Sequence, residues 1–351
     1  MVKLLVSLPL LLWVAALACH AADDLPVLVY PCPRAEAPPV IDGRLDDPCW
    51  KATAAVDSFT LFADQALAPV QTFFRVTYDG AALYLAITCD EPTPQRVAKV
   101  AMARDQVEIF RSEAVEIFLD PGHTHRGFYQ LGVNPAGSLY DDESTLGTAW
   151  DSGAAVAAIL GEQAWYVELA IPWSSIGVTP RSGQVHGFNV CRDRYIGAGQ
   201  PWSNWARVMG TFHDPVRFAH LVLSPTPAQM SKLGAEFRKD GRTGPIRIAT
   251  TKGLSDALYQ PLLQAALDEL DARVAELRQI AAGEREQAVR EGIDAALTRF
   301  AAEADQARAA LASGSADAET LPRLELRVNQ IRVELENVIW QVRLETLLSG
   351  I

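Results

Sequence analysis

Cysteine and positively charged residues are scarce in the sequence, and each shortage argues against certain classes of site or partner. Five cysteines occur in 351 residues, with no Cys-x-x-Cys pair and no Cys/His spacing typical of a zinc site. Lys and Arg number 31 against 43 Asp and Glu, which gives a formal net charge of −12. This balance disfavours nucleic acid and anionic membranes as partners, whereas acid-rich loops suit Ca²⁺.

Signatures of catalysis are also missing. The histidines have no His-Glu-x-x-His spacing, and Ser174-Ser175 lacks the glycines of a nucleophile elbow. Glu116 and Glu168 could be paired as in a glycosidase, but both lie in predicted strands, and a chain with many acids always offers such pairs. The sequence therefore predicts a protein that is not an enzyme.

Long apolar runs are absent after the first residues. Lys3 followed by the apolar run Leu4–Leu17 predicts a signal peptide over residues 1–21, with small residues for cleavage. Cleavage before Cys19 is the lipoprotein alternative. No other segment approaches the roughly 20 apolar residues of a membrane helix, so we expect no membrane span. The protein is predicted to be exported, to the periplasm, the cell surface or the medium.

Four cysteines remain after such cleavage: Cys32, Cys49, Cys89 and Cys191. An oxidising compartment permits disulfides, and four cysteines allow three pairings. A Cys32–Cys49 bond would pin the N-terminal arm, and a Cys89–Cys191 bond would join two strands. Buried free thiols are the alternative, and the sequence leaves the choice open.

The chain changes character near residue 225. Residues 22–225 hold short apolar runs separated by Gly, Pro and Asn turns, which predicts a mainly antiparallel β-sandwich of nine or ten strands. Asp79-Gly80 predicts a type I′ hairpin turn, and Pro172–Gly177 predicts one helical turn ended by glycine. Residues 226–253 are predicted to be a linker.

Residues 254–351 show helical periodicity instead. Apolar stripes starting at Leu263, Val289 and Leu324 recur at 4-3-4-3 spacing, and the last is an uninterrupted heptad seam of the coiled-coil type. They predict an antiparallel helical hairpin or, if it breaks near Gly283, a small three-helix bundle. The stripes are either only the seam between these helices or also a surface for dimerisation or a protein partner.

One family shares the order of motifs in the first region. About residues 38–223 resemble family-nine carbohydrate-binding modules, which have a DOMON-like β-sandwich fold. No single motif is specific, but seven occur in register: Val40–Trp50, Tyr78–Leu85, Val115–Asp120, Val133–Gly137, Val167–Trp173, Gly187–Asn189 and Asp214–Leu223. The helical tail lies outside this resemblance.

The resemblance implies a sugar held between two aromatic side chains, which fall on Phe110 and Phe212. Family members that bind sugar tend to have Trp there; Phe offers less stacking area and no N–H donor. Glu116 and Asn134 fall on polar contact positions. An arginine expected two residues before Asn134 is Gly132 here.

Other side chains complete the expected site. Arg192 and Arg194 are expected to supply the missing guanidinium, since alternate strand residues share a face; solvated strand positions are the alternative. Trp202 and Trp205 lie in a Gly/Pro/Ser-rich loop and are predicted as exposed platforms. Three other tryptophans are predicted to lie in the core: Trp50, Trp165 and Trp173.

The resemblance implies no obligatory cofactor, but it implies structural Ca²⁺. Asp120, Asp141 and Asp142 carry loop oxygens of the right kind, although a run such as Asp141-Asp142-Glu143 is more often an acidic turn exposed to solvent. DOMON-like sandwiches also bind haem through Met, Lys or His ligands, for which Met102 is the candidate here.

The sequence therefore predicts an exported, non-catalytic protein that binds an oligo- or polysaccharide in carbohydrate catabolism. A surface interaction protein that uses the helices, and a haem-binding electron carrier, are the alternatives.

Overall fold

The computed structural model describes residues 24–197, 199, 201–256, 258–284, 287–314 and 319–349. The predicted signal peptide and Cys19 lie outside these ranges. Within them, every helix is too short or too polar to cross a bilayer. The chain forms two compact units: Leu25–Met230 with Pro245–Ala257, and Ser231–Gly244 with the chain from Leu258 onward.

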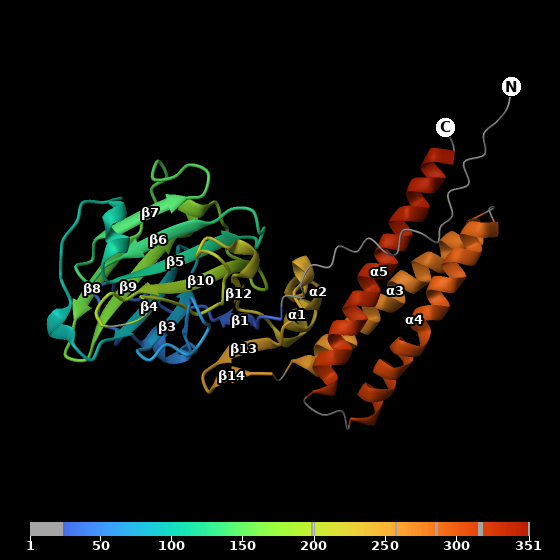
Figure 1. The fold of residues 1–351 in the computed structure, drawn as a ribbon, viewed down its shortest axis with the longest axis horizontal. Helices are drawn as coiled ribbons and strands as arrows, with labels where there is room; N and C mark the ends of the chain where they lie inside the picture. The colour runs from blue at the N-terminus through green and yellow to red at the C-terminus, as the bar shows by residue number, and fades with distance from the viewer. Residues whose placement is uncertain are drawn as a thin grey trace. The chain divides into compact units, whose positions relative to one another are not determined.

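The first unit is a β-sandwich of a large and a small sheet (Figure 1). The large sheet runs in the order β14-β13-β1-β12-β10-β5-β6-β7, and β11 and β2 extend it beside β10. Its strands are β1 Val27–Cys32, β2 Thr60–Leu61, β5 Ala114–Pro121, β6 Tyr129–Val133, β7 Leu139–Glu143, β10 Val185–Asp193, β11 Trp202–Asn204, β12 Ala219–Leu223, β13 Ile246–Thr250 and β14 Gly253–Ser255. The small sheet has the order β3 Thr72–Tyr78, β4 Ala82–Asp90, β9 Ala164–Pro172 and β8 Ala155–Leu160.

Short 3-10 helices connect the strands. They are η1 Pro48–Ala52, η2 Pro94–Arg96, η3 Val107–Arg111, η4 Trp173–Ile176, η5 Pro215–Arg217 and, in the second unit, η6 Lys239–Gly241. As predicted, η4 ends at a glycine: Gly177 has a φ of 66°, a conformation that glycine adopts without steric cost.

The period of two along each strand fills the core between the sheets. In β5, Val115, Ile117 and Leu119 point into this core and are fully buried. Full burial of one such side chain contributes about 1.5–3 kcal/mol. Glu116 and Phe118 therefore point to the opposite, outer face of the large sheet.

Two local expectations differ from the structure. Gly80 is absent from the residues of positive φ, so the β3–β4 connection is not a type I′ turn. Asp79 holds it instead, because its Oδ1 accepts hydrogen bonds from the backbone N–H groups of Ala81 at 2.7 Å and Ala82 at 3.0 Å.

The segment predicted as a linker is largely structured. It contains α1 Pro227–Ser231 and α2 Gly234–Phe237, followed by β13 and part of β14. β13 pairs in parallel with β1, with Val27 opposite Ile246, and β1 pairs in parallel with β12 on its other side. The large sheet is thus mixed rather than wholly antiparallel.

The second unit contains three long helices: α3 Tyr259–Gly283, α4 Gln287–Ser313 and α5 Thr320–Ser349 (Figure 1). The chain breaks at Gly283, so the three-helix alternative is confirmed. The predicted stripes meet in one core that includes Leu267, Ile293, Phe300 and Ile331, all nearly fully buried.

The structure shows where the predicted core tryptophans lie and that the described cysteines are unpaired. Trp50, Trp165 and Trp173 are at most 2% exposed, as predicted. The four cysteines of the described chain are free thiols, and only Cys49 is not fully buried.

Candidate functional site

A cavity of about 410 Å³ opens on the outer face of the large sheet. The strand period explains its polar lining: Glu116, Gln130 and Asp142 alternate with core residues of β5, β6 and β7. Its volume suits a small ligand. We call it the aromatic pocket; it is lined by Phe62, Val107, Phe110, Glu116, Gln130, Tyr140, Asp142, Asp193, Tyr195, Trp202, Gly210, Thr211, Phe212 and His213.

The two predicted clamp residues and Trp202, one of the two predicted platforms, line this one pocket. Phe110 comes from η3, Trp202 from β11, and Phe212 from the loop before η5. The Trp202 side chain is 40% exposed, which suits stacking against a ligand. Phe212 also packs edge-on against Phe62, with ring centroids 5.3 Å apart. Its neighbours on the sheet therefore fix it in place without burying it.

Gly132 stands at the position where the resemblance leads us to expect an arginine. A Cβ atom on Gly132 would lie 2.6 Å from Cε1 and 2.8 Å from Cζ of Phe110. Phe110 also packs edge-on against Tyr140, with ring centroids 4.9 Å apart. The phenyl ring therefore lies against the bare backbone at this position, and a side chain there would collide with it.

Two acidic side chains share the floor of the pocket. Glu116 is 5% exposed and Asp193 is 1% exposed, and they hydrogen-bond to each other. Burial raises the pKa of Glu116 to about 7, and burial together with the nearby Glu116 charge raises the pKa of Asp193 well above its usual range. One proton shared between the two carboxyl groups accounts for this contact.

A polar chain continues from Glu116 along the wall. Gln130 Nε2 donates to Glu116 Oε2 at 2.5 Å, and Gln130 Oε1 lies 3.0 Å from His213 Nε2. Tyr140 donates its hydroxyl proton to Asp142 Oδ2 at 2.8 Å. These contacts fix the orientation of the polar groups before any ligand arrives.

Asp193 and Tyr195 were not predicted from the sequence. Tyr195 is 43% exposed, and its hydroxyl donates to the backbone carbonyl of Phe110 at 2.8 Å. Glu113 holds this segment, because its Oε1 accepts from the N–H groups of Tyr195 and Ile196. The signal was available: Cys191, Asp193 and Tyr195 alternate on one face of β10 and its extension.

A family model described as "Carbohydrate family 9 binding domain-like" matches residues 41–226, which is more than half of the chain. The chain belongs to this family. The match is to a binding domain and not to a catalytic one, so these residues form a carbohydrate-binding module.

Curated relatives are much longer than this chain. Endo-1,4-beta-xylanase A of Thermoanaerobacterium saccharolyticum is 23% identical over 69% of this chain and 21% of its own length. Exoglucanase XynX of Acetivibrio thermocellus is 25% identical over 69% of this chain and 22% of its own length. Endo-1,4-beta-xylanase A of Thermotoga maritima is 27% identical over 53% of this chain and 17% of its own length. The chain thus spans about a fifth of the length of these relatives.

Two solved structures are of a family 9 module from Caldicellulosiruptor kristjanssonii. In complex with glucose it is 18% identical, covering 57% of this chain and 96% of that chain, with a TM-score of 0.44. In complex with cellotriose it is 18% identical, covering 57% and 94%, with a TM-score of 0.43.

The opening motif of the family 9 domain has a structural role here. Glu168 of β9 is fully buried; its Oε1 accepts from Trp50 Nε1 at 2.9 Å, and its Oε2 accepts from the N–H groups of Asp42 and Gly43 at 3.2 and 3.0 Å. Glu168 therefore ties the N-terminal segment to the small sheet. Glu116 lies on the large sheet, so the two glutamates do not flank one cleft as a glycosidase would require.

The two arginines differ from expectation. They do share a face of β10, but it is the face opposite Asp193. Arg192 is fully buried and donates to the carbonyls of Gln71 and Asp90. Arg194 donates from Nε and Nη2 to the carboxylate of Glu91 at 2.9 and 3.0 Å. Neither guanidinium lines the aromatic pocket.

Asn134 and Trp205 also lie elsewhere. Asn134 is 1% exposed, and its Oδ1 accepts from the N–H groups of Ala136 and Ser138 at 3.0 Å, so it shapes the β6–β7 turn. Trp205 is 2% exposed and packs on Phe74 in the core, so it is not a platform. Trp205 follows Trp202 by three residues, and this odd spacing along an extended chain turns the Trp205 side chain to the opposite face.

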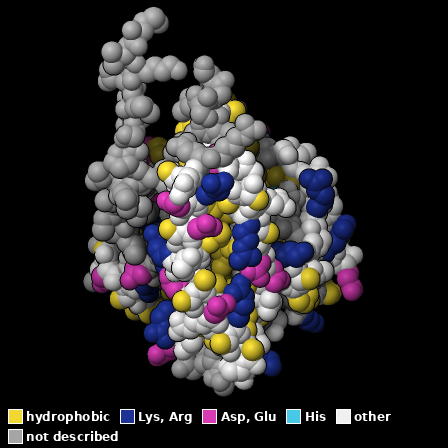
Figure 2. All heavy atoms as spheres, turned by 90° about the vertical axis from the view of Figure 1, so that its right-hand side faces the viewer, with side chains coloured by type: hydrophobic (Ala, Val, Ile, Leu, Met, Phe, Trp, Pro, Cys, Tyr) yellow, Lys and Arg dark blue, Asp and Glu magenta, His cyan; other side chains and the backbone are white. Residues whose placement is uncertain are grey.

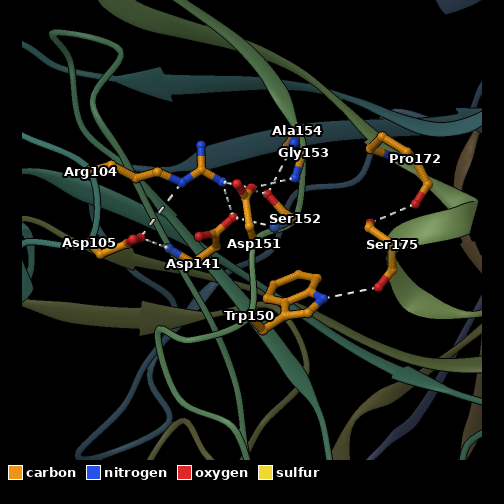
Figure 3. A network of polar contacts seen from close by, with 10 residues as sticks. All are labelled: Arg104, Asp105, Asp141, Trp150, Asp151, Ser152, Gly153, Ala154, Pro172 and Ser175. Carbon is orange, nitrogen blue, oxygen red and sulfur yellow. Dashed lines mark hydrogen bonds and ion pairs between the residues drawn. The ribbon is translucent and has the colours of Figure 1, made fainter.

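The predicted calcium ligands accept from protein donors. Asp120 accepts from the backbone N–H groups of Thr124 and His125. Asp141 is fully buried and accepts from Arg104 Nη2 at 2.5 Å and from the Ser152 N–H at 2.8 Å (Figure 3).

The Arg104 guanidinium thus lies where a cation bound by Asp141 would lie. Arg104 also reaches Asp151 at 2.6 Å, and both carboxylates converge on it in Figure 3. Among the described residues, Asp120, Asp141 and Asp142 do not bring three ligand atoms within 4.8 Å of one another. Calcium binding stays a prediction. The haem candidate Met102 is partly buried, donates its N–H to Ser138, and does not line the aromatic pocket.

Proposed function

We propose that this family 9 domain binds one end or one ring of an oligo- or polysaccharide in the aromatic pocket. The observation that carries the proposal is the convergence of Phe110, Trp202 and Phe212 on a cavity whose floor is polar. Sugars have C–H faces that stack on aromatic rings and hydroxyls that need fixed polar partners.

Isothermal titration against cello- and xylo-oligosaccharides tests this proposal, a panel suited to the names of the curated relatives. Phe212→Ala and Trp202→Ala should each weaken binding about tenfold, since a lost ring stack is worth about 1.5 kcal/mol. Leu146→Ala is the control, because Leu146 is 61% exposed and does not line the aromatic pocket. Absence of heat with every sugar, or unchanged affinity in both pocket variants, contradicts the proposal.

We infer further that the protein is exported and serves polysaccharide recognition or carbohydrate catabolism. The apolar run Leu4–Leu17 after Lys3 supports export, and the family supports a carbohydrate target. Activity of the kind that the longer relatives are named for would reside outside the matched domain.

We also propose that α5 is an interface with a second copy of the chain. Val333, Trp340 and Leu347 follow one another at heptad spacing, and Leu344 lies beside them. Their exposed fractions are 46%, 68%, 70% and 57%, respectively. Figure 2 shows one face of the molecule, on which hydrophobic side chains lie among Lys, Arg, Asp and Glu side chains. An apolar stripe of this spacing, flanked by both charges, suits helix pairing.

A further inference from the structure

The lining of the aromatic pocket contains three acidic side chains, and its one histidine is the only basic residue among the described lining residues. Glu116, Asp142 and Asp193 all line it, whereas none of the described residues in its lining is Lys or Arg. Phe110 occupies the space next to Gly132, where the family resemblance places an arginine. Asp142 and the proton-sharing pair Glu116–Asp193 therefore give the pocket a negative charge.

Three side chains of the lining already use hydrogen-bond donors within the protein. The hydroxyl of Tyr140 donates to Asp142, and that of Tyr195 donates to the carbonyl of Phe110. Gln130 donates to Glu116. Each of these donors already has a protein acceptor.

Two hydrogen-bond acceptors of the lining, by contrast, have no donor in the described part of the chain. Asp193 Oδ2 and Asp142 Oδ1 are buried and have no hydrogen-bond partner among the described residues. Asp193 as a whole is 1% exposed, and it lines the pocket. A buried carboxyl oxygen without a donor is unfavourable whether or not the group shares a proton, and a donor on the ligand would relieve that cost.

These observations indicate which chemical group a ligand should present to the pocket. A hydroxyl donates one hydrogen bond but also brings lone pairs, for which this lining has few donors. An ammonium group only donates, is positively charged, and is attracted to aromatic ring faces as well as to carboxylates. A carboxylate or sulfate on the ligand would be repelled by the same acids.

We propose that the aromatic pocket selects a saccharide bearing a protonated amine, an amino sugar, over the neutral sugar of the same shape. This inference rests on the proposed saccharide binding and narrows its ligand class. Asp193 and Asp142 would accept from the ammonium group, while Trp202 and Phe212 stack on the ring.

A matched ligand pair tests the proposal. The β-1,4-linked disaccharide of glucosamine and cellobiose share linkage and ring stereochemistry, and the amine replaces one hydroxyl on each ring. Titration near pH 7 keeps much of such an amine protonated, since α-type amines have pKa values of about 8. We expect the glucosamine disaccharide to bind at least about tenfold more tightly than cellobiose, and its N-acetylated form to lose that advantage.

Charge-neutral variants locate the effect. Asp193→Asn and Asp142→Asn keep the side-chain shape, and each should reduce the preference for the amine at least about threefold while cellobiose affinity changes less. Glu162→Gln is the control, since Glu162 is an exposed acid in the β8–β9 turn, and it should leave the preference unchanged. Thermal melts establish that each variant is folded.

The outcomes separate the two proposals. Equal affinity for both disaccharides, or a preference that survives in both Asn variants, overturns the amino-sugar assignment but leaves saccharide binding intact. Tetramethylammonium binding as tight as the glucosamine disaccharide also overturns it, because the pocket would then recognise the cation without the ring. No binding of any sugar refutes the proposed function itself, and this inference with it.

Discussion

At the scale of single residues, the site depends on which face of β10 a side chain occupies. Asp193 faces the aromatic pocket, whereas Arg192 and Arg194 face inward and bind carbonyls and Glu91. The sequence shows that Arg192 and Arg194 share a face, but it does not show which face is lined by the ligand cavity. That choice depends on the register with β5, where Glu116 lies opposite Cys191.

The shared proton of Glu116 and Asp193 predicts how stability depends on pH. The pKa of Glu116 is about 7 in the folded protein and near 4.5 otherwise, because burial disfavours the carboxylate. A raised pKa of an acid gives stability that is complete below about pH 4.5 and is lost as pH rises through about 7. We therefore expect the melting temperature of the β-sandwich to fall over this range.

Glu116→Gln should flatten this dependence, because an amide has no proton to lose. Its melting temperature should exceed that of the wild type above pH 7 and not below pH 4.5. Glu162→Gln again serves as the control and should follow the wild-type curve. Melting curves recorded across this pH range decide the matter, and an unchanged slope in Glu116→Gln would refute the assignment.

At the scale of elements, the strands were predictable because each carries its own evidence. The alternation in β5 and the turn residues between strands are local signals. β13 also alternates, with Arg247 between Ile246 and Ile248, but it is short, its partner β1 is more than 200 residues away in sequence, and parallel pairing leaves no hairpin turn between them. For that reason, β13 was predicted as part of the linker.

The same scale explains why a family motif need not touch the ligand. Glu168→Ala should remove one acceptor from Trp50, Asp42 and Gly43 together and cost about 3 kcal/mol. For a unit of this size, we expect a melting temperature lower by about 6–12 °C. Sugar affinity of the folded fraction should stay unchanged, since Glu168 lies on the small sheet; titration below the transition checks this, and a large loss of affinity there would contradict the structural role.

At the scale of the whole molecule, the chain joins a binding module to a helical unit with an apolar face of its own. The sequence showed the heptad seam of α5, but a seam and an exposed stripe have the same composition. Burial separates them: Ile331 and Leu335 are fully buried, whereas Trp340 is largely exposed.

Trp340→Glu tests whether this face joins two copies. A charge at the centre of an apolar interface is costly to bury, so the variant should shift the protein from dimer to monomer in light scattering after size exclusion. Trp202→Glu, at the exposed tryptophan of the pocket, should leave the mass unchanged. A wild-type monomer at all accessible concentrations would end the proposal.

The contact between Phe110 and Gly132 has a consequence for how the pocket could have changed in evolution. Each residue permits the other: the ring fits only because position 132 has no Cβ, and an arginine fits there only if the ring is absent or moved. An arginine introduced at position 132 alone would therefore collide with the Phe110 ring, and a pocket with that arginine requires two coordinated substitutions. A basic group at position 132 and the Phe110 ring thus exclude each other.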